Sequence, residues 1–339
     1  MGNVHSYVVA SATACSLYVI YAHIYCSHKL LHSREFRSDQ LPSPSYLCLR
    51  YLIRSLSRTR GRLNATPRDQ GELVCTVSHN KLEDSVLRRF CRAAGYGWDY
   101  PDSEYRDIPL CFPEFLCLTP LLIVLTDKNF RLSPAGLTRV RQTLRTHQPV
   151  DELKKGPFVL QVHVLEYRPV DAGVEVDVRL SAISRCQSLV WESVLTLVST
   201  NKLSTTTSTN ENERVKQALV CEDAKQVMVS APCGSELHYL WSFSGLLSGP
   251  ARLLGLRLHT APSLWMLSVS LAEVEKHQGV GVITAPANVS VHFKRPLRAP
   301  GKINIQFGTQ GKDGSLLHFR MLQPQDNLCH MEGVISRCL

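Results

Sequence analysis

The sequence predicts an α+β fold in which antiparallel sheets wrap around central helices, preceded by one N-terminal transmembrane helix. Apolar and polar residues alternate with the period of a β-strand in two blocks, which lie on either side of a polar tract. One apolar helix pattern precedes four strand-like runs in the second block, which is the layout of a sheet that covers a helix. Residues 7–24 contain no Asp, Glu, Lys or Arg and can form a helix that crosses a membrane.

The length and composition predict a folded chain with more than one packed unit. With 339 residues, the chain exceeds the size at which a single core stops growing. Apolar residues make up 44% and charged residues 20%, which is ordinary for a globular protein. The formal net charge is +9, and basic residues are concentrated between Lys29 and Arg68. No interleaved aromatic residues or nucleic-acid-reading motif accompany them, so we interpret this segment as basic sequence beside a membrane and expect no nucleic-acid partner.

The N-terminal apolar stretch predicts a membrane anchor at residues 5–27. A cleaved signal peptide would have basic residues before the apolar run and small residues at a cleavage site, whereas here the basic residues follow it. The distribution of positive charge then places the folded body in the cytosol. Because the apolar stretch is close to the shortest possible span, an interfacial helix or a buried core helix remains an alternative.

The cysteines and histidines give no sign of a metal site or a disulfide framework. The 12 cysteines are scattered without a Cys-x-x-Cys pair, and we expect them to be reduced; a luminal protein with some disulfides is the alternative. The histidines on predicted strands lack the spacing of metal ligands, so we expect neither a metal nor another cofactor. These histidines are His238, His292, His318 and His330.

The body opens with a poorly patterned segment and then a first unit. Residues 28–109 are predicted to be a basic linker with irregular structure, and the first unit is predicted at residues 110–201. Its opening apolar run is interrupted by Pro113, Glu114 and Pro120, which leave it too short to span a membrane. Three strand-like runs follow and predict an antiparallel meander. They are residues 157–169, 173–184 and 189–200.

A second unit is predicted at residues 216–339, after a polar linker at residues 202–215. It contains a helix pattern at residues 262–277, whose apolar positions follow a period near 3.6 and whose Glu273 and Glu275 are expected to face outward. Strand-like runs precede and follow this helix. They are residues 236–243, 288–297, 302–308, 316–322 and 329–336.

The second unit carries a resemblance to a known family. Residues 290–301, SVHFKRPLRAPG, resemble the segment V-x-F-K-R-P-L-x-x-P-G of MaoC-like acyl dehydratases and (R)-specific enoyl-CoA hydratases. The runs GKDGSLLHFRML and CHMEGVIS resemble the last two strands of that family, and residues 130–148 with Trp191 and Glu192 resemble the degenerate first unit of its two-unit members. The resemblance implies a double hot-dog fold, in which each antiparallel sheet wraps around a helix.

The resemblance also implies a reaction whose catalytic motif is missing here. Family members hydrate or dehydrate a 3-hydroxyacyl thioester with an Asp and a His in D-x-N-P-x-H, because the elimination of water needs a positioned base and acid. This sequence instead continues from Gly245 as LLSGPARLLG, without Asp, Asn or His. The catalytic residues are therefore unassigned. His259 is a candidate acid or base only because it lies shortly before the helix, and a structural or surface role is the alternative.

Substrate-binding residues follow from the resemblance by position. In thioester-binding relatives basic residues contact the nucleotide phosphates, and Lys294 and Arg295 occupy the matching segment, with Arg298 close behind. Trp241 and Trp265 are candidates for lining an acyl tunnel. The alternatives are a solvated strand end for the basic residues and an ordinary core position for the tryptophans.

The sequence therefore predicts a membrane-anchored MaoC-like protein with impaired catalysis. Its expected partners are acyl-CoA or another acyl thioester and the membrane, and a homodimer is compatible with the fold. Two alternatives remain open: a non-enzymatic protein that binds acyl thioesters or lipids or acts as a scaffold, and an active dehydratase whose catalytic loop is missing from the gene model.

Overall fold

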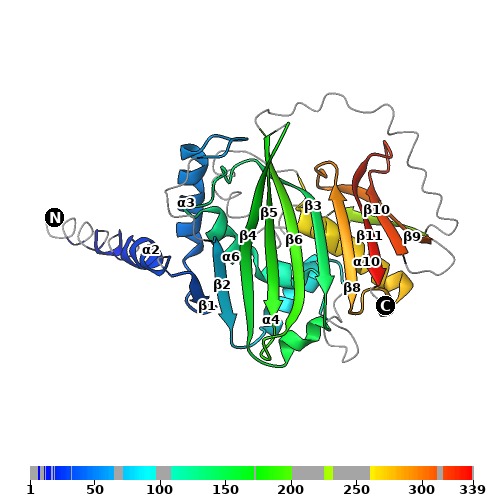
Figure 1. Ribbon diagram of the computed structural model, residues 1–339, viewed down its shortest axis with the longest axis horizontal. Helices are drawn as coiled ribbons and strands as arrows, with labels where there is room; N and C mark the ends of the chain where they lie inside the picture. Colours follow the sequence, from blue (N-terminus) through cyan, green and yellow to red (C-terminus); the bar gives the residue numbers. More distant parts are fainter. Residues whose placement is uncertain are drawn as a thin grey trace.

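The structure is a computed structural model in which one continuous sheet extends along the body of the molecule (Figure 1). It describes residues 20–64 except 32, 72–96, 108–200 except 172, 225–231, 260–310 and 316–337, with scattered positions between Tyr7 and Tyr18. The eleven strands of the described chain follow the order β1-β2-β4-β5-β6-β3-β8-β11-β10-β9-β7. Neighbouring strands are antiparallel except β1 and β2, which are parallel.

The first half of the sheet is built around a meander. Strands β4, β5 and β6 are consecutive in sequence and pair with their neighbours, which confirms the meander predicted from the alternation of apolar residues. Along β5, Val174, Val176 and Val178 are buried between half-buried polar neighbours, as a strand with one face on the core requires. The strands of this half are β1 (Glu35–Arg37), β2 (Val74–His79), β3 (Leu137–Thr146), β4 (Phe158–Val170), β5 (Gly173–Ile183) and β6 (Leu189–Thr200).

The second half contributes five further strands and the longest helix. The helix α10 (Ser263–Gln278) contacts β9 and β10, and the predicted helix at residues 262–277 is confirmed. The strands are β7 (Lys225–Ala231), β8 (Ala287–Phe293), β9 (Gly301–Gln310), β10 (Leu316–Leu322) and β11 (Cys329–Arg337). The linker predicted at residues 202–215 and the strand predicted at residues 236–243 lie outside the described residues.

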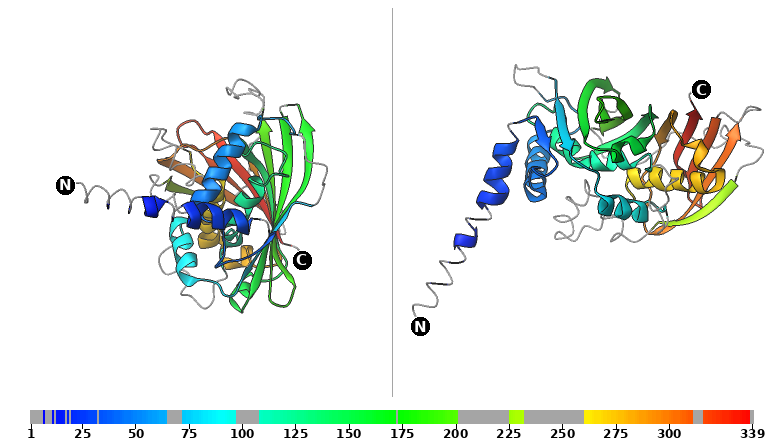
Figure 2. Two further views of the ribbon diagram at one scale, coloured as in Figure 1. Left: turned by 90° about the vertical axis from the view of Figure 1, so that its left-hand side faces the viewer. Right: turned by 90° about the horizontal axis from the view of Figure 1, so that it is seen from below.

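Two antiparallel strands, β3 and β8, join the halves into one sheet. Leu144 lies opposite Val289, and at the end of the pair Thr146 Oγ1 accepts a hydrogen bond of 3.0 Å from the backbone N–H of Ala287. The helices α5 and α6 lie against the first half, and α10 lies against the second (Figures 1 and 2). Each half thus wraps a sheet around helices, which confirms the double hot-dog fold.

The remaining helical elements surround this core. They are η1 (Ile20–Tyr25), α2 (Cys26–Leu30), α3 (Pro44–Ser57), α4 (Asp84–Ala93), α5 (Phe112–Leu116), α6 (Leu118–Leu125), η2 (Val150–Lys154) and η3 (Val280–Val282).

The helix α10 is buried around its whole circumference. Every residue from Leu264 to Glu275 is buried. The expectation that Glu273 and Glu275 face outward is wrong, because both residues are buried. The chain at the end of α4 packs against this helix, with Ala93 O bonded to Trp265. The carboxylate of Glu273 forms an ion pair with Lys276 Nζ at 2.7 Å.

The segment expected to be a basic linker with irregular structure, residues 28–109, contains regular elements instead. Strand β2 pairs with β4 in the main sheet, and α3 and α4 bury Leu47 and Phe90. The arginines of this segment take part in folding: Arg50 donates to Thr126 O at 3.0 Å, and Arg58 donates to Asp127 O at 3.0 Å. These bonds satisfy carbonyl groups just beyond the C-terminal end of α6, where an arginine stabilises the helix.

The N-terminal elements η1 and α2 extend from one end of the body (Figure 2). Tyr18, Ile20 and Tyr21 are exposed there. Among the described residues, no helix combines the length and the apolar character that a membrane crossing requires, so the transmembrane helix predicted at residues 5–27 has no support in this part of the chain.

Candidate functional site

The candidate site lies where α10 begins, against the segment that resembles MaoC-like proteins. Thr260 forms an antiparallel bridge with Arg298, and the backbone N–H of Ala261 donates to Leu297 O at 2.7 Å. These contacts hold the start of α10 beside the turn between β8 and β9. Pro262 occupies the N-cap and provides no side-chain cap, so the positive end of the helix is not neutralised by a capping side chain.

Lys294 and Arg295 follow β8 directly and differ in their surroundings. Their backbone N–H groups both donate to the carbonyl oxygen of His330, at 2.9 and 3.3 Å. The ammonium group of Lys294 lies 2.8 Å from the carboxylate of Glu332 on β11. Arg295 is exposed. A phosphate would therefore meet Arg295 directly, whereas Lys294 would have to exchange Glu332 for the ligand.

His330 fixes the turn that carries these basic residues. The ring is buried, with Nδ1 3.1 Å from Pro296 O and Nε2 3.3 Å from Gln323 Oε1. Burial lowers the pKa of His330 below its usual value. The buried ring lies between Pro296 and Gln323, so His330 has a structural role.

Trp265 occupies the core, where it connects α10 to α4. Its side chain is buried, and the indole Nε1 donates to the carbonyl oxygen of Ala93 at 3.1 Å. Next to this contact, a Cβ at Gly95 would be 3.2 Å from Val269, so the chain after α4 passes close to α10. The other two residues singled out in this region, Trp241 and His259, lie outside the described residues.

The structure brings together a buried polar cluster that the sequence did not indicate. Glu114 on α5 is fully buried, and its Oε1 lies 2.6 Å from Arg139 Nη1. Gln142 Nε2 donates to Glu114 Oε2 at 2.6 Å and to Ser193 Oγ at 3.0 Å. Both carboxylate oxygens of Glu114 thus have a partner. The sequence signal for this cluster is a Glu in an otherwise apolar run, a pattern that by itself argues only against a membrane span.

Arg139 links this cluster to the seam between the two halves. The pairing of β3 with β6 is shifted between Arg139 and Arg141, as at a β-bulge. The guanidinium carbon of Arg139 lies 5.8 Å from the ring centroid of Phe293, the last residue of β8. Arg139 of the buried charge pair is therefore close in space to Phe293, the residue that precedes the Lys294–Arg295 turn.

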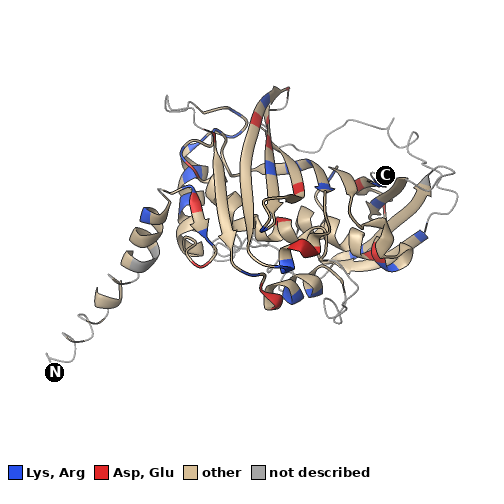
Figure 3. Ribbon diagram, turned by 60° about the horizontal axis from the view of Figure 1, so that its bottom comes forward, with Lys and Arg blue, Asp and Glu red and all other residues tan. Residues whose placement is uncertain are grey.

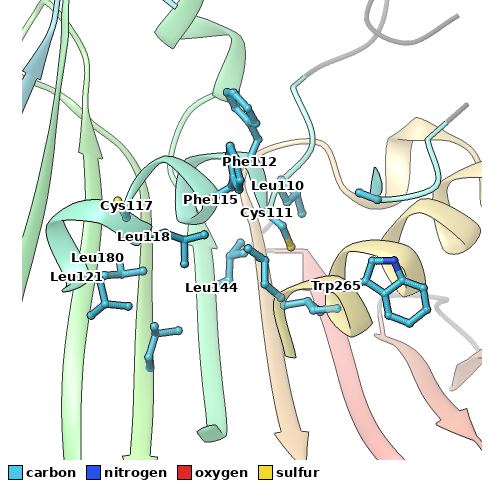
Figure 4. Packing of buried hydrophobic residues seen from close by; sticks show 14 of the residues in the cluster. Leu110, Cys111, Phe112, Phe115, Cys117, Leu118, Leu121, Leu144, Leu180 and Trp265 are labelled. Atoms are coloured by element: carbon cyan, nitrogen blue, oxygen red, sulfur yellow. The ribbon is translucent and has the colours of Figure 1, made fainter. Parts of the chain in front are cut away.

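Cys111 lies in the buried cluster where α5 approaches α10 (Figure 4). Burial raises the pKa of the Cys111 thiol far above its usual range, and the nearby Glu114 carboxylate raises it further. Such a thiol stays protonated and is no nucleophile. Its contact with Ser268 is a packing contact between the two halves. Among the described residues, no cluster of His, Cys, Asp or Glu has the composition of a metal site.

The fold and the site define the class as a double hot-dog protein, and solved structures share this fold. HtdX of Mycobacterium tuberculosis matches with a TM-score of 0.56 and 13% identity, over 78% of this chain and 100% of HtdX. A MaoC-like dehydratase from Phytophthora capsici matches with a TM-score of 0.54 and 12% identity, over 79% of this chain and 95% of the dehydratase. The full-length peroxisomal multifunctional enzyme type 2 from Drosophila melanogaster matches with a TM-score of 0.55 and 13% identity, over 78% of this chain and 48% of that enzyme.

Unlike the structural comparisons, the comparisons of sequence give no match. No family model matches the chain, and no curated protein gives a significant match. The resemblance to MaoC-like proteins that residues 290–301 indicated is confirmed at the level of the fold.

Proposed function

We propose that this chain is a membrane-attached relative of the 3-hydroxyacyl-thioester dehydratases and enoyl-CoA hydratases that still binds an acyl thioester but turns it over poorly. The observation that carries the proposal is the start of α10, held by Ala261 and Leu297 against the turn that resembles MaoC-like proteins. In a hot-dog enzyme of this type, the positive end of the central helix stabilises charge on the thioester oxygen.

The expected defect follows from the missing motif. Between Gly245 and Gly255 the sequence contains no Asp, Asn or His, where the family has its D-x-N-P-x-H motif. Positioned acid and base groups each contribute a factor of roughly 100 to 10,000 to the rate. Glu114 is a poor substitute, because both of its oxygens are engaged by Arg139 and Gln142. Binding can therefore persist where catalysis is lost.

The proposed ligand is acyl-CoA or another acyl thioester with an anionic carrier. Arg295 is exposed beside the start of α10 and can contact a phosphate. Lys294 would contribute after release from Glu332, whose carboxylate lies 2.8 Å away. This exchange predicts that binding weakens with ionic strength.

Membrane attachment through residues 5–27, with the body in the cytosol, is part of the proposal. The exposed side chains of Tyr18, Ile20 and Tyr21 on the projecting N-terminal elements support it, because such side chains are normally buried in a membrane or a partner. The basic residues that follow, beginning with Lys29, support the cytosolic orientation.

The test is hydration of crotonyl-CoA by the full-length chain, compared with a MaoC-like dehydratase of intact motif and with a His259→Ala variant. We expect turnover at least about 10,000-fold below that of the intact enzyme. We also expect acyl-CoA to raise the melting temperature, as a ligand of the native state must. Turnover near that of the intact enzyme would overturn the proposed impairment, and loss of that turnover in His259→Ala would identify a relocated acid or base. Absence of both turnover and a shift in melting temperature would overturn thioester binding.

A further inference from the structure

The helix α3 presents an apolar face to solvent. Leu49, Leu52, Ile53 and Leu56 are 41%, 36%, 53% and 88% exposed. Their spacing of three, four and seven residues from Leu49 places them on one side of a helix. We call these four residues the outer face of α3.

This outer face has no role in holding α3 to the body. The helix is attached through its other side, where Leu47 and Tyr51 are buried and the Tyr51 hydroxyl donates to Pro134 O at 3.0 Å. Arg50 on α3 and Arg58 just after the helix bond to carbonyl groups after α6. A surface helix of a globular protein normally carries polar residues on the side away from the core. An apolar stripe in that position is typical of a helix that contacts a membrane or a partner protein.

The segment that contains the outer face is rich in positive charge. Residues 1–64 contain eight Lys or Arg residues and two acidic residues, so this part of the chain carries +6 of the total formal charge of +9. Figure 3 shows Lys and Arg on the helices at this end of the molecule. Lys29, Arg60 and Arg62 are exposed there. Apolar residues flanked by basic residues complement the interface of a bilayer with anionic headgroups.

The start of α3 adjoins the N-terminal elements. The imidazole Nδ1 of His28 lies 2.7 Å from the Tyr46 hydroxyl, and the backbone N–H of Ser43 donates to Ser27 Oγ at 3.0 Å. These contacts fix α2 against the start of α3, and both helices lie at the same end of the molecule (Figures 1 and 2). A membrane that contacts the described part of the N-terminal elements is therefore next to the start of α3.

We infer that the outer face of α3 is a second membrane contact, which inserts Leu49, Leu52, Ile53 and Leu56 into the interface of an anionic bilayer. The inference extends the membrane attachment proposed for residues 5–27 and can be tested separately from it. The contact would fix the orientation of the body, because two attachment points restrict rotation that a single tether permits.

The experiment measures binding of the full-length chain to vesicles of phosphatidylcholine with and without one third phosphatidylserine. Four proteins are compared: wild type, an α3 variant, an N-terminal variant and their combination. The α3 variant carries Leu49→Ser, Leu52→Ser, Ile53→Asn and Leu56→Ser, and the N-terminal variant carries Tyr18→Ser, Ile20→Asn, Tyr21→Ser and Ile24→Asn. We expect the N-terminal variant to retain salt-sensitive binding to the anionic vesicles. The α3 substitutions should weaken this remaining binding at least about tenfold.

Matched controls separate the outer face of α3 from exposed apolar residues in general. Met228 on β7 and Leu316 on β10 are 62% and 40% exposed, and Met228→Ser with Leu316→Ser should leave binding unchanged. Unchanged binding in the α3 variant, in both N-terminal backgrounds, would overturn the inference while leaving the attachment by residues 5–27 intact. Unchanged binding in the N-terminal variant together with loss in the α3 variant would overturn that attachment and support the inference.

A second measurement distinguishes lipid from protein as the occupant. Leu56→Trp should gain fluorescence quenching by brominated lipids when anionic vesicles are added, whereas Met228→Trp should not. Sedimentation of the full-length chain, without vesicles, tests a second copy as the occupant. A wild-type dimer that the α3 substitutions convert to a monomer, with no lipid quenching at position 56, would overturn the inference. Circular dichroism confirms that each variant keeps its fold, since the substituted side chains are all exposed.

Discussion

Glu114 and Arg139 form an ion pair of 2.6 Å in the interior of the molecule, between the helix α5 and the seam strand β3. The side chain of Glu114 is fully buried and that of Arg139 is 11% exposed. Gln142 and Phe293 complete the surroundings of the two charges. A buried pair of this kind offsets the desolvation of both ions only while both are present.

Removing one charge of the pair should therefore destabilise the protein strongly. We expect Glu114→Gln to lower the free energy of unfolding by about 3 to 5 kcal/mol, because Arg139 then remains buried without a counter-ion. The double variant Glu114→Gln/Arg139→Met should recover a large part of this loss. Urea unfolding of the three proteins measures the coupling between the two side chains.

The exposed pair of Arg141 and Glu175 supplies the control. Its nitrogen–oxygen distance is 2.8 Å, and the Arg141 side chain is 48% exposed. Arg141→Met should change the free energy of unfolding by about 1 kcal/mol or less, because solvent screens exposed pairs. An equally small effect of Glu114→Gln would show that water enters the Glu114 site or that Arg139 can turn outward.

Close approach of the strands β8, β10 and β11 leaves no room for a side chain at Gly333. A Cβ there would be 2.4 Å from the Phe319 ring and 2.9 Å from the carbonyl oxygen of Ser290. Gly333→Ala should lower the free energy of unfolding by about 1 to 3 kcal/mol, since both neighbours are in the core. A Cβ at Gly301 would be 3.5 Å from the carbonyl oxygen of Arg298, an ordinary contact, so Gly301→Ala should be close to neutral when thermal unfolding compares the two variants. Equal stability of the two variants would contradict the packing described for the second half.

The parts of the fold that sequence could predict are those that depend on local periodicity. The alternation in Val174, Val176 and Val178 indicated β5 because a strand with one buried face repeats every two residues. The apolar positions of α10 recur with a period near 3.6 residues, which indicated a helix. The local sequence could not show whether Glu273 faces solvent or the core, because this depends on which element covers the other side of α10.

Contacts between distant residues account for most of what sequence missed. Residues 28–109 contain short elements such as β1, three residues long, whose pattern is too brief to stand out among basic residues. The pair of Glu114 and Arg139 joins residues far apart in sequence, so neither position alone indicates the other. The basic residues Arg50 and Arg58 suggested a membrane-facing linker, yet both bond to carbonyl groups after α6, and burial lowers the pKa of Arg58 to about 10.

Two roles can be tested at Trp265. The sequence predicted that it lines an acyl tunnel, whereas its hydrogen bond to the carbonyl oxygen of Ala93 indicates a core position. Trp265→Phe removes the indole N–H and leaves the Ala93 carbonyl without this donor. We expect a loss of about 1 to 2 kcal/mol in the free energy of unfolding. The affinity for acyl-CoA, measured by calorimetry below the melting temperature, should not change. A weaker affinity with unchanged stability would favour the tunnel role.

The stability of the second half should depend on pH through His330. Burial lowers the pKa of this imidazole in the folded protein, whereas in the unfolded chain its pKa is about 6.5. Below that pH the unfolded state binds more protons, so stability is fully present above about pH 6.5 and falls as the pH drops toward the folded-state pKa. One such group changes the free energy of unfolding by at most about 1.4 kcal/mol for each pH unit. Urea unfolding between about pH 7.5 and pH 5 measures this change in the free energy of unfolding.

His330→Gln should flatten the dependence of stability on pH, whereas His292→Gln at an exposed position of β8 should leave that dependence unchanged. An unaltered slope in His330→Gln would show that other groups cause the loss of stability in acid.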